Sequence, residues 1–132
     1  MKIYVAARFF DKQKVKEVYK RLKADGHEIT ADWTGHLNPK PFTKNQKIAK
    51  QYAVKDLTGV INCDVFILLT NKQSGTGSST ELGAAFALNI KVNKPKIYIV
   101  GEHIDGNMFH FHPVANLRKT IEEVYNELNL KI

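Results

Sequence analysis

One short segment combines glycines with hydroxyl side chains and ends in a carboxylate. Its sequence is Ser74-Gly75-Thr76-Gly77-Ser78-Ser79-Thr80-Glu81. Gly75 and Gly77 would let a ligand approach the backbone closely, and the hydroxyls of Ser78 and Ser79 suit a phosphate or sugar oxygen. The segment matches neither the Walker pattern nor the dinucleotide-binding fingerprint. An ionised Glu81 beside such a loop could attack an electrophilic sugar carbon.

Glu81 has two interpretations from sequence. The run Ser78-Ser79-Thr80-Glu81 has the pattern of a capping box, in which the glutamate bonds back to the amide at the helix start. In the other interpretation, a carboxylate at a helix N-terminus stays ionised because it faces the positive end of the helix dipole. Both the structural and the catalytic roles remain open at this stage.

A second carboxyl group, Asp56, lies at the edge of the apolar stripe of a predicted helix. It could be a surface acid paired with Lys50 or Lys55. It could also be half-buried beside Glu81, where it would donate a proton or position a sugar.

Tyr4 and Arg8 belong to the N-terminal segment and would share one face of a strand, because side chains alternate with a period of two. Tyr4 could donate a hydrogen bond to a catalytic carboxylate, and Arg8 could bind a phosphate. The alternatives are a core tyrosine and a surface arginine.

Aromatic side chains could hold a nucleobase near these groups. Trp33 and His36 could stack on a base from the loop after the second predicted strand, with Phe9 nearby, although packing in the core is an alternative role for Trp33. His110 and His112 would point the same way on a strand, but a metal site needs a third ligand that the spacing does not supply. We therefore expect no metal.

The elements that must position these residues follow from apolar patterning. Nearly continuous apolar runs predict covered strands at residues 3–7, 65–69 and 97–100, with weaker candidates at 27–33 and 109–112. Helical spacing predicts helices between 11 and 26 and over 49–61, 82–90 and 117–128.

Strands and helices alternate along the chain, which predicts an α/β fold with a mostly parallel, five-stranded sheet between two helix layers. In the five-stranded version of such a sheet, the strand order reverses between the first and third strands. Ligands bind such sheets beyond the carboxyl ends of the strands, at the point where the strand order reverses. The predicted site therefore joins residues 7–10 to residues 70–79.

Composition narrows the class of protein. The chain has 132 residues, a net charge of +7 and a single cysteine, Cys63, so we expect one domain over residues 1–132, no internal disulfide and a cytoplasmic location. No apolar run approaches the roughly 18 residues that span a bilayer. Basic residues are scattered, so we expect neither a membrane nor a nucleic-acid partner.

The helix at 82–90 is apolar on nearly all sides, which predicts a homodimer or larger homo-oligomer.

Several segments together resemble the nucleoside 2-deoxyribosyltransferase superfamily, which includes the 2′-deoxynucleoside 5′-monophosphate N-glycosidases. The segments are Tyr4-Val5-Ala6-Ala7-Arg8-Phe9, Asp56, Cys63-Asp64-Val65-Phe66-Ile67-Leu68-Leu69, Gly75-Thr76-Gly77 and Glu81-Leu82-Gly83-Ala84-Ala85. The resemblance implies a flavodoxin-like three-layer sandwich with a five-stranded sheet of order 2-1-3-4-5, and neither a metal nor an organic cofactor. It implies that Glu81 attacks the anomeric carbon, that Asp56 is the second catalytic carboxyl and that Tyr4 orients Glu81.

The C-terminus departs from the transferases of this superfamily. Their donated Asn- or Asp-bearing segment has no counterpart in Asn129-Leu130-Lys131-Ile132, which favours hydrolysis. The predicted function is cleavage of the N-glycosidic bond of a (deoxy)nucleoside or its 5′-monophosphate through a glycosyl-enzyme on Glu81. Base exchange between nucleosides and a non-catalytic nucleotide-binding module are the alternatives.

Overall fold

The computed structural model describes residues 1–130, so two residues of the C-terminal segment discussed above, Lys131 and Ile132, lie outside it. All strand pairs of its five-stranded sheet are parallel, and their order is β2-β1-β3-β4-β5. The strands are β1 (Lys2–Ala6), β2 (Glu28–Ile29), β3 (Val65–Leu69), β4 (Lys96–Val100) and β5 (Ala115–Arg118). The predicted α/β class and strand order are confirmed.

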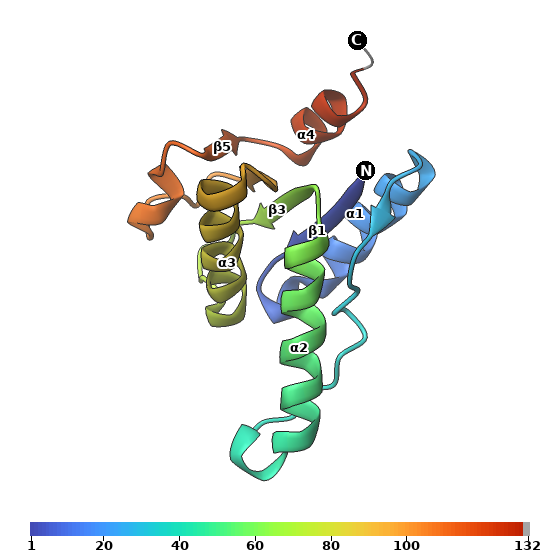
Figure 1. Cartoon of the computed structure of the whole chain (residues 1–132), viewed down its shortest axis with the longest axis vertical. Coiled ribbons are helices and arrows are strands. Elements are labelled where there is room, and N and C mark those ends of the chain that lie inside the picture. The colour runs from blue at the N-terminus through green and yellow to red at the C-terminus, as the bar shows by residue number, and fades with distance from the viewer. Residues whose placement is uncertain (131–132) are drawn as a thin grey trace.

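Four helices cover the two faces of the sheet, three of them between consecutive strands and the fourth after β5 (Figure 1). They are α1 (Lys12–Ala24), α2 (Gln46–Asn62), α3 (Thr76–Val92) and α4 (Ile121–Leu128). Helices α2 and α3 pack side by side against β1. On the other face, the Arg21 guanidinium of α1 lies 4.7 Å from the Tyr125 ring centroid of α4. The three central strands are buried because helices lie over both of their faces.

The last strand lies later in the chain than the sequence indicates. Residues 109–112 do not form a strand, because Met108–Phe111 is a 3-10 helix and β5 begins at Ala115. The Asn107 side chain accepts a hydrogen bond from the amide of Phe109 and so starts this turn. The alternating Phe-His-Phe-His pattern is typical of a strand, but Phe109 and Phe111 are both exposed.

Three helices also begin at different residues from those predicted. Helix α2 begins at Gln46 rather than residue 49, and helix α3 begins at Thr76 rather than residue 82. Helix α4 begins at Ile121 rather than residue 117, and its N-cap Thr120 accepts a hydrogen bond from the amide of Glu123. Within residues 1–130, none of the helices has the length and apolar character required to cross a bilayer.

Candidate active site

The half-buried Glu81 of α3 contacts Tyr4, a buried residue of β1. The Tyr4 hydroxyl donates a hydrogen bond to Glu81 Oε2. Tyr4 is fully buried in β1, where its ring stacks on Phe66 of β3 with centroids 5.8 Å apart. The donor is therefore fixed by the sheet, and a contact between residues 77 positions apart sets the direction of the carboxyl.

The capping box predicted at residues 78–81 is not present. The N-cap of α3 is Gly75, which makes no side-chain cap bond, and Glu81 is the sixth residue of the helix. Ser78 and Ser79 instead donate their hydroxyl hydrogens back to the Gly75 carbonyl, at 3.0 and 2.9 Å. Glu81 therefore has no capping role and its carboxyl is directed to Tyr4.

Burial, rather than the helix dipole, controls the charge of Glu81. The dipole acts within the first turn, and Glu81 lies beyond it. Desolvation raises the pKa of Glu81 to about 7; the Tyr4 hydrogen bond opposes this rise and the charge of Asp56 adds to it. At pH 7 the carboxyl is therefore near half ionisation rather than fully ionised. Burial also raises the pKa of Tyr4 far above its usual range, so its hydroxyl stays a neutral donor.

Asp56 approaches from α2 and pairs with a histidine rather than with a lysine. His36 Nε2 lies 3.0 Å from Asp56 Oδ1 and 3.3 Å from Oδ2. Lys55 instead donates to the backbone carbonyl of Asp32, at 2.8 Å. Burial raises the pKa of Asp56, and the hydrogen bond from His36 opposes that rise. Because the Asp56 charge also raises the pKa of Glu81, the two carboxyls act on one another.

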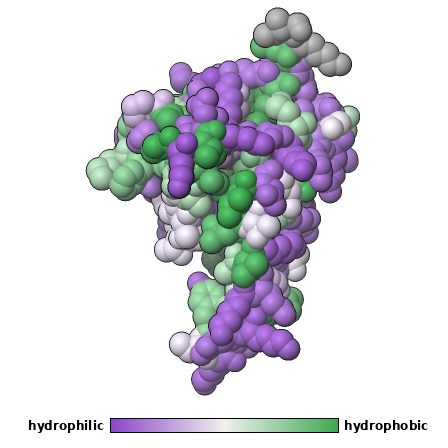
Figure 2. All heavy atoms as spheres, in the orientation of Figure 1, coloured by the Kyte–Doolittle hydropathy of each residue, from purple (hydrophilic) through white to green (hydrophobic). Residues whose placement is uncertain are grey.

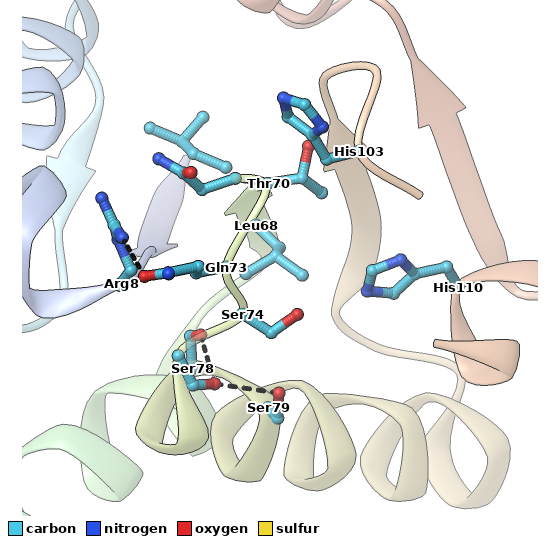
Figure 3. A pocket seen from close by; sticks show the side chains of 12 residues that line it. Arg8, Leu68, Thr70, Gln73, Ser74, Ser78, Ser79, His103 and His110 are labelled. Atoms are coloured by element: carbon cyan, nitrogen blue, oxygen red, sulfur yellow. Dashed lines mark hydrogen bonds between the residues drawn. The ribbon is translucent and has the colours of Figure 1, made fainter. Parts of the chain in front are cut away.

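A pocket opens at the carboxyl ends of β1 and β3 (Figure 3). Arg8, Gln73, Ser78 and His110 are among its lining residues, and neither Glu81 nor Tyr4 is. Ser78 lies three residues before Glu81 on α3, so the pocket and the carboxyl are one helical turn apart. The pocket thus occupies the place where the strand order reverses.

Arg8 is held in this pocket and still has an unpaired donor. Its guanidinium donates to Gln73 Oε1 at 3.1 Å and to Asp11 Oδ1 at 3.4 Å, while Asn71 donates to the other oxygen of Asp11 at 2.9 Å. Arg8 Nε is buried without a hydrogen-bond partner. A buried donor without a partner is costly, and this atom is shielded from solvent as well as unpaired.

The two glycines of the loop have different surroundings. A Cβ on Gly75 would lie 2.9 Å from Ser78 Oγ and 3.1 Å from Arg8 Cα, so a side chain at this position would push the Arg8 segment away. A Cβ on Gly77 would meet nothing within 4 Å. Gly75 is therefore needed by the fold, whereas the space over Gly77 is open to a ligand.

The aromatic residues have separate positions. Trp33 is buried, and its Nε1 donates to the Val5 carbonyl at 2.7 Å, which supports the packing role. Phe9 is half-buried against the core and meets the exposed Phe10 edge to face. Of these rings, only those of Phe9 and Phe10 present surface to a base.

The histidines at 110 and 112 lie on or next to a 3-10 turn instead of the predicted strand. His110 Nδ1 lies 3.1 Å from the Ile104 carbonyl, and His112 packs on Phe86. Among the residues that the structure describes, no three His, Cys, Asp or Glu side chains form a group that could hold a metal ion.

Sequence reasoning missed the partner of Asp56 and part of the pocket. His36 was assigned to base stacking, and only the spacing of Tyr52 and Asp56, one turn apart on α2, could have indicated that a ring would fit between them. His103 lines the pocket from the β4–β5 connection, and no motif identifies it.

Comparison with solved structures finds the same fold in the CMP N-glycosidase BcmB of Clostridium botulinum. The TM-score is 0.61 and the identity 18%, and the match covers 98% of this chain and 100% of that one. At this identity the likeness shows the fold. No protein-family model matches the chain, and no curated protein matches it significantly.

Proposed function

We propose that this protein cleaves the N-glycosidic bond of a (deoxy)nucleoside 5′-monophosphate, in the manner of the nucleoside 2-deoxyribosyltransferase superfamily. The observation that carries the proposal is the Glu81 carboxyl, held by the buried Tyr4 hydroxyl and electrostatically coupled to Asp56. The structural neighbour, which is named a CMP N-glycosidase, supports the same class of substrate.

The proposed reaction has two steps. A Glu81 oxygen attacks C1′ of the sugar, the electron pair of the C1′–N bond leaves with the base, and Asp56 gives its proton to the base nitrogen. Water then attacks C1′, Asp56 takes the proton of that water, and the Glu81 carboxylate is released. This scheme needs Glu81 ionised and Asp56 protonated at the start, and it returns both groups to those states.

The pocket at the carboxyl ends of β1 and β3 would hold the 5′-phosphate. The pocket is lined by Arg8, by Ser74 and by the N-terminal end of the 17-residue helix α3. Each of these groups favours an anion. Phe9 and Phe10 would border the base, and Gly77 would leave room for the sugar. Water is the proposed acceptor, and the chain would act as a homo-oligomer.

Incubation with a panel of nucleosides and their 5′-monophosphates, followed by chromatography for free base, tests the proposal. We expect release from a monophosphate, and loss of at least about 1,000-fold in turnover for Glu81→Gln. Glu122→Gln, an exposed change on α4, is the matched control and should retain activity. Near-normal base release by Glu81→Gln would disprove the assignment.

Addition of a second free base separates hydrolysis from base exchange, because exchange would yield a new nucleotide.

A further inference from the structure

His36 has an unusually constrained ring for a residue in a loop. Its Nε2 contacts both oxygens of Asp56, and the side chains of the two residues are only 12% and 18% exposed. The ring also stacks on Tyr52, with centroids 3.7 Å apart and planes inclined by 13°. Both its face and its edge are therefore fixed by α2.

Tyr52 also fixes the loop that carries His36. Its hydroxyl accepts a hydrogen bond from the amide of Leu37 at 3.1 Å, while the amide of His36 donates to the Trp33 carbonyl at 3.0 Å. Ring stacking and backbone bonds together hold the imidazole at one place between Tyr52 and Asp56. A surface histidine that only meets solvent would need none of these contacts.

Other charged groups also act on Asp56, and they do so through space. Lys55, next to it on α2, favours its ionised form. The Asp56 charge in turn raises the pKa values of residues on other elements, namely Glu81 of α3, Tyr4 of β1 and Tyr19 of α1. Within residues 1–130, His36 supplies the hydrogen bonds to the Asp56 side chain, so it is the group best placed to control that carboxyl.

We propose that His36 is a positioning residue: its Nε2–H holds the Asp56 carboxyl in one orientation and stabilises the carboxylate left after Asp56 protonates the departing base. The proposal rests on the proposed N-glycosidase function. The proton passes from Asp56 to the base nitrogen as the C1′–N bond breaks, and Asp56 recovers one from the attacking water. His36 gains and loses no net proton in the cycle.

The proposal makes His36 responsible for part of the acidity of Asp56. Without it, burial is less opposed, so the pKa of Asp56 rises and its proton is released less readily. The effect should fall mainly on kcat, because His36 acts on the proton-transfer step. A purely structural loop residue would change stability or KM without moving the titration of Asp56.

The test is a carbon-13 NMR titration of the Asp56 carboxyl in the wild type, His36→Phe and His36→Gln. We expect the midpoint to rise in His36→Phe and to rise less in His36→Gln, since glutamine keeps a donor. His27→Gln, near the N-terminus of β2 and bonded to Asn129, is the matched control and should leave the midpoint unchanged. A folded His36→Phe with an unshifted midpoint would overturn the proposal.

Two further measurements complete the test. In the wild type, the ring nitrogens of His36 should sense the same titration step as Asp56, and an insensitive ring would also overturn the proposal even if His36→Phe fails to fold. In turnover, kcat should fall on the order of 10- to 100-fold in His36→Phe, with partial rescue in His36→Gln; equal losses in both variants would overturn it. The titration needs no turnover, so failure of the proposed reaction itself would be seen separately, as no base release by the wild type.

Discussion

At the scale of single residues, Glu81 combines two properties that oppose one another. A nucleophile must be ionised, but burial raises the pKa of this carboxyl to about 7. The Tyr4 hydroxyl partly offsets that rise because it hydrogen-bonds the ionised form. The charge of the reacting group thus depends on one neutral donor from β1.

Tyr4→Phe removes that donor, so the pKa of Glu81 should rise above its wild-type value. We expect the wild type to have the acidic limb of its kcat/KM profile near pH 7, and we expect this limb to move to higher pH in Tyr4→Phe. The measurement is base release as a function of pH. An unchanged acidic limb in a folded variant would show that Tyr4 does not control the charge of Glu81.

The same burial makes stability depend on pH. The pKa of Glu81 is raised on folding, so between about pH 4.5 and 7 the folded state binds more protons than the unfolded state, and stability falls as pH rises. Glu81→Gln removes this loss. Denaturation with urea should show the variant more stable than the wild type by roughly 3 kcal/mol at pH 8 and nearly equal to it at pH 4.5. Glu122→Gln should show no such difference.

At the scale of elements, helix α2 packs closely on β1 at one glycine, Gly59. A Cβ on Gly59 would lie 2.6 Å from the Ala31 Cβ and 3.1 Å from the Tyr4 ring, so no side chain fits there without moving α2. This close packing brings Asp56, which precedes Gly59 by less than one helical turn, towards Tyr4 and Glu81. The helix position and the site geometry therefore depend on the same contact.

Gly59→Ala should destabilise the fold by about 1 to 3 kcal/mol, because the added methyl group overpacks the contact between α2 and β1. Gly83→Ala is the matched control: Gly83 is also inside a helix, but its Cβ would meet nothing within 4 Å. That control should be neutral or stabilising by about 0.5 to 1 kcal/mol, since alanine favours the helix. Urea denaturation of both variants measures the difference, and equal effects would contradict the account.

The elements also show where prediction from sequence succeeds. Continuous apolar runs such as residues 65–69 and 97–100 located the central strands, because burial on both faces leaves no polar position. The strand predicted at residues 109–112 was wrong, because alternation alone does not distinguish a strand from an exposed turn. The contact of His36 with Asp56 depends on how a loop folds back onto α2, which no local pattern encodes.

At the scale of the whole molecule, an apolar surface runs over α2 and α3 (Figure 2). Its exposed large side chains are Val54, Leu57 and Ile61 of α2 and Ile90 and Val92 of α3. The predicted apolar character of residues 82–90 thus continues onto a second helix. Contiguous apolar surface of this kind is typical of a protein–protein contact.

We expect sedimentation at micromolar concentration to show a dimer or larger oligomer built on this surface. Ile61→Glu should shift the equilibrium towards monomer because it places a charge in the contact. Leu130→Glu alters an equally exposed residue of the C-terminal segment and should not change the oligomeric state. A wild type that sediments only as a monomer would contradict the prediction.

The buried indole of Trp33 has a practical consequence. It is the chain's single tryptophan, and it donates to the Val5 carbonyl near the end of β1, just before Arg8. All indole fluorescence therefore comes from one shielded fluorophore packed against β1, the strand that leads to Arg8. Its emission should be blue-shifted in the native protein, and titration with nucleotides should quench or enhance it without any added label.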